Sequence, residues 1–268
     1  AKLCGEITPR SYTAATLVEM LHTATLIHDD VVDDAKTRRG LASINAVWKN
    51  KIAVLMGDFM LSRGLLLALE NDECGFLKIT SRAVKRMSEG ELLQIQKNRK
   101  FDVNEETYFR IISDKTASLI NACCELGAAS TSKDKNEVKL MGEFGENLGI
   151  AFQLRDDLLD YIGKKKIMGK SSGSDLKEKK FTLPLIHSLN NASKKEAKDI
   201  VSLVKNGSYS KSRSIVMDFI KEHNGIEYTI DKTTEYCATA KNNLQSFKPS
   251  ETKDTMIKFV DFISERVN

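Results

Sequence analysis

The residues of this chain with the clearest chemical potential are aspartates that occur twice in one arrangement. The stretch LIHDDVVDD (26–34) carries Asp29, Asp30 and Asp33. The stretch QLRDDLLDY (153–161) repeats the Asp-Asp-x-x-Asp spacing with Asp156, Asp157 and Asp160. Residues four apart share one face of a helix, and like charges there repel by roughly 0.2–0.5 kcal/mol per pair. Helix formation does not favour such a pattern, so the pattern points to a ligand.

Carboxylates in this arrangement predict a cation site. Two such helix faces turned toward each other form a chamber of oxygen donors, and oxygen donors without His or Cys suit Mg²⁺ shared with a substrate phosphate. A single Asp-Asp-x-x-Asp motif is commonly only a solvated helix face. Here both copies have apolar flanks, which predicts burial and favours a functional site: Leu26, Ile27, Val31, Val32, Leu158 and Leu159. An EF-hand is excluded because its loop glycine and terminal Glu are absent.

Basic residues provide binding groups for an anion. Arg38 and Arg39 follow the first motif after four intervening residues, and two adjacent guanidinium groups suit the forked hydrogen bonds of a diphosphate. Lys115, Lys170 and Lys180 are further candidates, although each alone is more commonly a surface residue. Metal and basic side chains together predict a phosphorylated substrate.

The elements that position these residues are predicted to be helices. Prolines occur only at positions 9, 184 and 249, which is unusual for a chain of strands and turns and natural for long helices. Apolar residues recur at helical spacing in 16–30, 106–129 and 142–161. We expect an all-α fold of roughly eight to ten helices in a single domain, with no linker that separates two.

Composition narrows the class of protein. The net charge is +4 and the basic residues are scattered, which does not indicate nucleic-acid binding. The five cysteines form no CxxC pair, which is typical of reduced thiols in a cytoplasmic protein. No apolar run approaches the ~18 residues of a membrane span, and no signal peptide is visible. We therefore expect a cytoplasmic protein without a transmembrane segment.

The ordered motifs of the chain resemble those of the trans-isoprenyl diphosphate synthases of the polyprenyl synthetase family. HDDVVDDAKTRRG is similar to the family's first aspartate-rich motif, with its following Arg-Arg-Gly, and FQLRDDLLDY is similar to the second. Further blocks follow in the family's order: GDFMLSRG (57–64), MSEGELLQ (87–94), KTASL (115–119) and GKSSGSDLKEKKFTLPLI (169–186). The resemblance covers nearly the whole chain.

The resemblance implies an all-α bundle of the isoprenoid synthase type around a central cavity, and a Mg²⁺-dependent prenyltransferase. An allylic prenyl diphosphate would be condensed with isopentenyl diphosphate by ionisation, condensation and elimination. Asp29 and Asp33, supported by Asp30, would bind two Mg²⁺ ions. Asp156, with Asp157 and Asp160 nearby, would hold a third.

The resemblance also assigns substrate contacts. The allylic diphosphate would be bound by Arg38, Lys115, Lys170 and Lys180, with Thr116 and Gln153 lining the site. The diphosphate of isopentenyl diphosphate would be bound by Arg39 and His22. Asp29, Asp30, Asp33, Arg38, Lys115, Asp156 and Lys170 would form the catalytic set. Family members carry a basic Gly-Lys-x-x-Arg-Pro stretch upstream of where this chain starts, so we expect the domain over 1–268 to lack its N-terminal helix or helices.

Product length is predicted from the residues just before the first motif. Short-chain members of the family tend to have an aromatic residue there, whereas Ala24 and Thr25 are small. We expect a long product, C30 or longer and as long as C40. The alternatives are a shorter-chain geranylgeranyl or farnesyl diphosphate synthase, a non-catalytic partner subunit, and a class I terpene cyclase. The family also implies a homodimer, for which ASLINACCELGAAS (117–130) is a candidate interface and ordinary core is the alternative.

Overall fold

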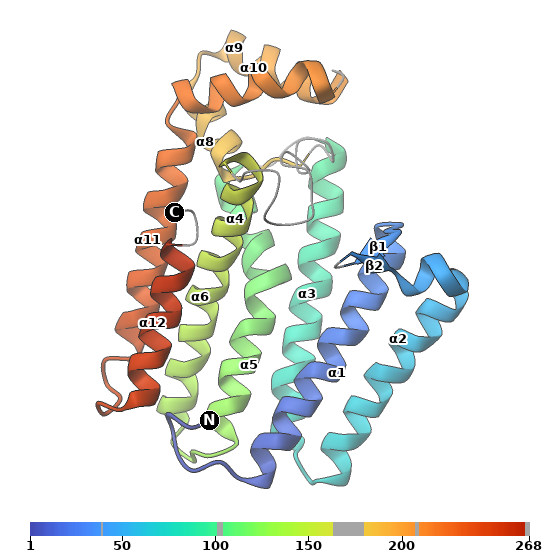
Figure 1. Cartoon of the computed structure of the whole chain (residues 1–268), viewed down its shortest axis with the longest axis vertical. Helices are drawn as coiled ribbons and strands as arrows, with labels where there is room; N and C mark the ends of the chain where they lie inside the picture. Colours follow the sequence, from blue (N-terminus) through green and yellow to red (C-terminus); the bar gives the residue numbers. More distant parts are fainter. Residues whose placement is uncertain (39, 101–103, 163–179, 207–208, 266–268) are drawn as a thin grey trace. The chain divides into compact units, whose positions relative to one another are not determined.

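The structure is a computed structural model of the whole chain, and it describes residues 1–38, 40–100, 104–162, 180–206 and 209–265 (Figure 1). Helices dominate these residues, which confirms the predicted all-α class. The helices are α1 (Pro9–Val32), α2 (Ile44–Glu70), α3 (Cys74–Lys100), α4 (Glu105–Ile112), α5 (Ser118–Ala129), α6 (Lys135–Ile162), α8 (Leu183–Asn191), α9 (Lys194–Asn206), α10 (Tyr209–Glu222), α11 (Gly225–Asn243) and α12 (Glu251–Glu265). A π-helical turn, η1 (Ser113–Ala117), separates α4 from α5.

Two short antiparallel strands follow α1. They are β1 (Thr37–Arg38) and β2 (Leu41–Ala42), in which Arg38 pairs with Leu41. Gly40 has a φ of 81°, which a glycine adopts without strain and which lets the chain reverse within the Arg-Arg-Gly motif.

The contacts between residues divide the chain into two compact units. The first comprises Ala1–Val84 and Asn121–Gly142, and the second comprises Lys85–Ile120 and Glu143–Asn268. Each unit has its own group of buried apolar side chains. The single domain expected from the sequence stays a prediction.

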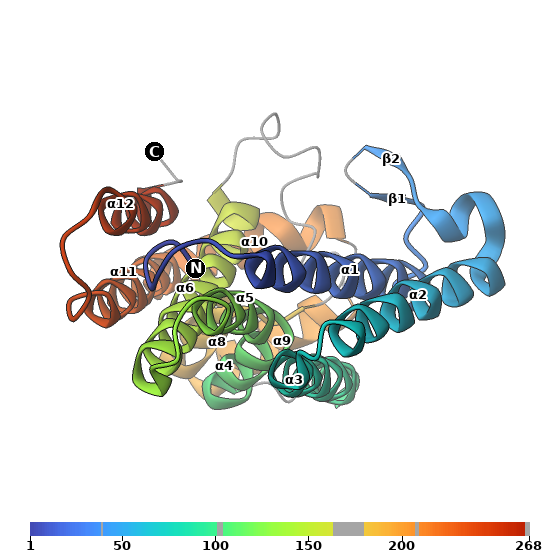
Figure 2. The same ribbon diagram turned by 90° about the horizontal axis from the view of Figure 1, so that it is seen from below.

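In the first unit, α1 and α2 run side by side in opposite directions (Figures 1 and 2). One face of α2 carries small buried residues at helical spacing, which are Ala53, Gly57, Gly64 and Ala68. A Cβ atom on Gly57 would lie 2.2 Å from Nε2 of His28 on α1. Small residues therefore allow the two helices to approach closely just before the first aspartate motif.

The opposite face of α2 is apolar and exposed. Its large apolar side chains are between 38% and 64% exposed, and they are Val47, Trp48, Ile52, Val54, Leu55, Met56, Phe59, Leu65, Leu66 and Leu69. By length and composition, α2 is apolar enough to cross a membrane, with a mean hydropathy of 1.8 in its most apolar window, 22% of which is buried. The predicted lack of a transmembrane segment therefore stays a prediction.

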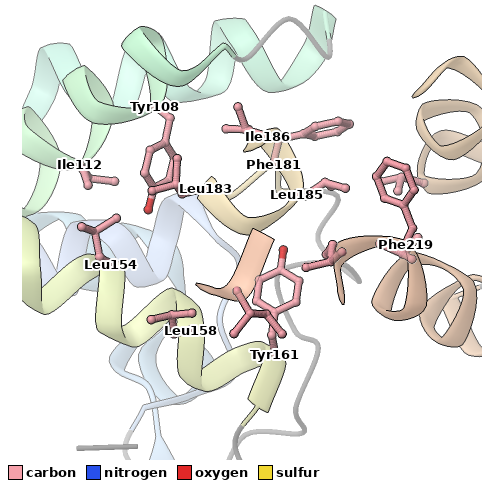
Figure 3. Close-up of a cluster of buried hydrophobic side chains, with 14 of the residues drawn as sticks. Tyr108, Ile112, Leu154, Leu158, Tyr161, Phe181, Leu183, Leu185, Ile186 and Phe219 are labelled. Carbon is pink, nitrogen blue, oxygen red and sulfur yellow. The ribbon is translucent and has the colours of Figure 1, made fainter. Parts of the chain in front are cut away.

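The second unit is built around α6 and α8. Leu154, Leu158 and Tyr161 of α6 pack with Leu183, Leu185 and Ile186 of α8 and with Phe181 just before it (Figure 3). The Tyr161 hydroxyl makes a hydrogen bond of 2.7 Å with Oγ1 of Thr182, and this satisfies both buried polar groups. The second aspartate motif lies on the same stretch of α6, so its position is fixed by this core.

Candidate active site

The first aspartate motif forms the C-terminal end of α1. Asp33 caps the helix, and Asp34 has a φ of 48°, a left-handed conformation that ends the helix. The backbone carbonyl of Asp30 accepts hydrogen bonds from the amide of Ala35 at 2.9 Å and from Nδ2 of Asn45 at 3.0 Å. The end of α1 is therefore held by the backbone that follows it and by a side chain of α2. Asp29 and Asp33 lie one turn apart on this end.

Arg38 returns from the strand pair to the same helix end. Its Nε donates to Oδ1 of Asp30 at 2.8 Å, and its Nη2 lies 2.7 Å from the same oxygen. Hydrogen bonding to Asp30 raises the pKa of Arg38 above its ordinary value. Asp30 is 5% exposed, so its charge is compensated inside the protein. Arg38 thus lies beside the first motif as predicted, but it is already bonded to one of the aspartates.

The surroundings of the first motif are more open than its apolar flanks suggested. Ile27 is buried, whereas Val32 is 61% exposed, so the expected burial is wrong for Val32. The pattern misled because α1 ends at Val32, and a residue at a helix end loses the cover of the next turn. Asp33 is exposed for the same reason, which leaves its carboxylate accessible to a ligand.

Further predicted residues lie on α1, upstream of the motif. Ala24 is 1% exposed, on the stripe of α1 that also buries Leu17 and Leu21. Thr25 donates its hydroxyl to the backbone carbonyl of His22 at 2.8 Å. Nδ1 of His22 is buried and has no hydrogen-bond partner among the described residues.

The second aspartate motif opens onto a cavity of about 220 Å³ within the second unit. Six predicted residues line it: Lys115, Thr116, Gln153, Asp156, Asp157 and Lys180. The third aspartate of the motif, Asp160, lies one turn beyond Asp156 on the same face of α6. Phosphate-binding and metal-binding groups predicted separately thus share one cavity.

A chain of hydrogen bonds fixes the polar wall of this cavity. Oγ1 of Thr116 donates to Oε1 of Gln153 at 2.9 Å, and Nε2 of Gln153 donates to Oδ1 of Asp157 at 2.7 Å. The hydroxyl of Tyr108 donates to Oδ2 of Asp157 at 2.6 Å. In Figure 3 this hydroxyl points toward α6. Each oxygen of Asp157 therefore already accepts a hydrogen bond.

Lys115 lies in the cavity wall among polar groups of α3. Its ammonium group pairs with Glu91 and donates to Oε1 of Gln94 at 3.3 Å. The side chain is 31% exposed, so it is accessible from the cavity. A diphosphate could replace Glu91 as its partner with little rearrangement, because lysine is a flexible point charge.

Several residues of the cavity were not singled out from the sequence. They are Gln94, Asn98, Tyr108, Ile111, Ile112, Phe181 and Thr182. Tyr108 had a detectable signal, since a phenol at a core position of an apolar helix needs a partner for its hydroxyl. Two predicted residues, Arg39 and Lys170, lie outside the described residues.

The two aspartate motifs lie in different units, so their convergence on one chamber stays a prediction of the sequence. A helical fold that carries both motifs, with lysines beside the second, is what the resemblance to the isoprenyl diphosphate synthases implies. Comparison with known proteins supports this class. The polyprenyl synthetase family model matches residues 1–221.

Individual relatives agree with the family match. Octaprenyl diphosphate synthase of Escherichia coli is 34% identical over 254 residues, which cover 95% of this chain and 79% of the relative. A decaprenyl diphosphate synthase structure from Rhodobacter capsulatus has a TM-score of 0.93 at 32% identity, covering 100% of this chain and 82% of the other. A polyprenyl synthase structure from Caulobacter crescentus, complexed with calcium and isoprenyl diphosphate, has a TM-score of 0.90 at 32% identity, with the same coverages, 100% and 82%.

This chain belongs to the polyprenyl synthetase family and is a trans-prenyltransferase. The predicted family, fold and polyprenyl diphosphate synthase activity are confirmed. The octaprenyl and decaprenyl enzymes among its relatives support the predicted long-chain product.

Proposed function

We propose that this prenyltransferase condenses an allylic prenyl diphosphate with isopentenyl diphosphate to give an all-trans polyprenyl diphosphate of C30 or longer. The observation that carries this assignment is the cavity in which Asp156 of the second motif meets Lys115, Thr116, Gln153 and Lys180. Such a wall offers carboxylate oxygens to a cation and ammonium groups to a diphosphate. The long-chain relatives support the product class.

The donor set fits Mg²⁺. The residues offered are carboxylates on two helices, and hard oxygen donors suit a Mg²⁺ ion that keeps water and substrate phosphate as its remaining ligands. We assign Asp29 and Asp33, supported by Asp30, to two ions, and Asp156, with Asp157 and Asp160 nearby, to a third. The bound metal supplies Lewis acidity toward the leaving diphosphate.

The side chains of the protein bind and orient the two diphosphates. Arg38, Lys115, Lys170 and Lys180 place positive charge around the allylic diphosphate, where negative charge develops as the C–O bond breaks. The bonding electrons leave with that diphosphate. The double bond of isopentenyl diphosphate, held through His22 and Arg39, supplies the electron pair of the new C–C bond, and a proton then passes to the released diphosphate.

We propose that product length is set by the α1 helix at Ala24 and Thr25. Ala24 is buried on the helix stripe that precedes the motif, so a larger side chain there occupies space inside the protein. Replacing Ala24 with Tyr is expected to shorten the product. The control is Thr16→Tyr, at an exposed position on the same helix, which should leave the length unchanged.

Product analysis by mass spectrometry tests the function. The chain is incubated with farnesyl diphosphate, isopentenyl diphosphate and Mg²⁺, beside an Asp156→Asn variant. Products of C30 or longer, lost in the variant, support the proposal. Growth that ends at C20 overturns the long-chain product and retains the reaction class. No condensation by the wild-type chain overturns the assignment.

We also propose a homodimer formed through the exposed face of α2. Ile52, Leu55, Phe59, Leu66 and Leu69 lie at the a and d spacing of a coiled-coil seam, in which Ser62 occupies the one polar position, and a second helix of the same pattern can pack against this seam. Monomeric proteins rarely expose an apolar patch larger than about 600 Å², whereas a standard interface covers about 800 Å² per partner. A long apolar face such as that of α2 is therefore more typical of an interface than of the surface of a monomer. The interface expected at 117–130 is less suited, because several of its residues lie in the chain's own core.

A pair of adjacent leucines on α2 tests the dimer. Leu66 lies on the seam and is 45% exposed, whereas Leu65 is off the seam and 38% exposed. Leu66→Glu should produce monomers in sedimentation equilibrium, and Leu65→Glu should remain dimeric. A monomeric wild-type chain, or a dimer that survives Leu66→Glu, overturns the proposed interface. Adsorption of the wild-type monomer to lipid vesicles would assign the face to a membrane instead.

A further inference from the structure

The π-helical turn η1 presents two of the cavity residues. It spans Ser113–Ala117 and contains both Lys115 and Thr116. A π turn is rare because its hydrogen-bond register is less favourable than that of an α-helix, and such turns frequently mark functional sites. Apolar residues recur at helical spacing through 106–129, and this pattern does not reveal the π turn.

Two glycines bring neighbouring helices against the backbone of η1. A Cβ atom on Gly90 of α3 would lie 2.7 Å from the backbone nitrogen of Lys115. A Cβ atom on Gly149 of α6 would lie 2.6 Å from Cα of Ala117. The turn is therefore confined on two sides by backbone, and its shape is tied to both helices.

A charged network joins the same three elements. Nε of Arg86 on α3 donates to Oδ1 of Asp114 at 2.8 Å. Its Nη1 and Nη2 donate to the two carboxylate oxygens of Glu146 on α6 at 2.9 and 2.7 Å, and Nη2 also donates to Oγ of Ser113 at 2.8 Å. The Ser113 hydroxyl donates to Glu146 at 2.5 Å.

The geometry of this network suits only arginine. The planar guanidinium places three nitrogens in fixed directions, which a lysine cannot reproduce. The Arg86 side chain is 27% exposed, and those of Asp114 and Glu146 are 17% and 21% exposed, so water competes weakly for these bonds. Hydrogen bonding to Glu146 raises the pKa of Arg86 above its ordinary value.

We propose that Arg86, Ser113, Asp114 and Glu146 form a clamp that positions Lys115 and Thr116 for the allylic diphosphate. None of the four lines the described cavity, so the clamp acts on the substrate through η1. They are positioning residues, and the inference rests on the proposed function of the cavity. Without the clamp, only the backbone contacts at Gly90 and Gly149 hold the turn, and relaxation toward an α-helix rotates Lys115 and Thr116 relative to Gln153 and Asp156.

The test compares two arginines of α3. Arg82 lies one turn before Arg86 and makes a similar two-oxygen pair with Glu125, at 2.8 and 2.7 Å, away from η1. We expect Arg86→Gln to lower kcat/KM for farnesyl diphosphate at least tenfold, with a raised KM, while Arg82→Gln stays within twofold of wild type. Arg86→Lys should recover little. Amide hydrogen exchange across 113–118 should accelerate in Arg86→Gln and not in Arg82→Gln.

Each outcome decides the proposal. Wild-type kinetics and exchange in Arg86→Gln overturn it, as does an equal loss in both variants or a loss of activity without faster exchange in 113–118. If Arg86→Gln does not fold, Ser113→Ala removes a single member of the clamp and is read in the same way. A wild-type chain that condenses no substrate refutes the function of the cavity, whereas the exchange measurement still tests the clamp.

Discussion

The close contact between α6 and η1 makes Gly149 a position at which one methyl group should destabilise the fold. In a Gly149→Ala variant the new Cβ would lie 2.6 Å from Cα and 2.8 Å from Cβ of Ala117, whereas ordinary contacts begin at 3.4 Å. The helix and the turn must separate by about 0.8 Å, the difference between 3.4 and 2.6 Å. Backbone atoms on the η1 side leave no flexible side chain to absorb this movement.

The magnitude follows from two opposing effects. Replacing glycine by alanine inside a helix contributes about 0.8–1 kcal/mol of stability. Overpacking a rigid contact costs about 1–3 kcal/mol and more where backbone must move. We expect Gly149→Ala to lower the free energy of unfolding by about 1–2 kcal/mol.

Gly142 on the same helix is the matched control. A Cβ atom there would first meet Nδ2 of Asn121 at 3.6 Å, an ordinary contact, so only the gain in helix propensity applies. Urea unfolding followed by circular dichroism should give a Gly142→Ala variant about 0.5–1 kcal/mol more stable than wild type. A Gly149→Ala variant as stable as Gly142→Ala would refute the predicted clash with η1.

Three further predictions concern other parts of the chain. Lys49 has φ 71° and ψ 161°, a region essentially restricted to glycine, so Lys49→Gly should raise the urea midpoint by an amount equivalent to about 1 kcal/mol. Burial raises the pKa of Cys123 to about 11 and that of Cys124 to about 12. Above pH ~9 the unfolded chain releases these two protons, whereas the folded chain keeps them. The free energy of unfolding should therefore fall by about 1.4 kcal/mol per pH unit for each thiol. Urea unfolding at pH ~8.5 and ~10.5 should show a smaller fall in the free energy of unfolding for a Cys123→Ala/Cys124→Ala variant than for the wild type. Tyr108→Phe removes one donor from Asp157, and unfolding and kinetic measurements should show a loss of about 1.5–3 kcal/mol in stability together with a reduced kcat/KM.

The fold class and the cavity residues were accessible from the sequence because they depend on local pattern. Helical periodicity placed Asp156 and Gln153 on one helix, and an i, i+4 rule placed Asp29 beside Asp33. Residue type alone then predicted a metal and a diphosphate. The family resemblance ordered these groups into one reaction.

The remainder depends on contacts that spacing does not encode. The bond between Arg38 and Asp30 requires the chain to reverse at Gly40. Asp157 accepts a hydrogen bond from Tyr108, which lies on a different helix. The exposed face of α2 has the same apolar composition as a core helix, and only its lack of cover in the structure distinguishes the two.

The π-helical turn can also be seen as a one-residue insertion. A π turn contains one residue more than an α turn over the same length, and each residue of an α-helix advances the side chains by about 100°. Deleting one residue within 113–117 would allow α4 and α5 to merge into a continuous α-helix with its flanking residues in their present contacts. Such a deletion would displace Lys115 and Thr116 from the cavity wall, so the one extra residue serves the placement of the site and not the packing of the helices.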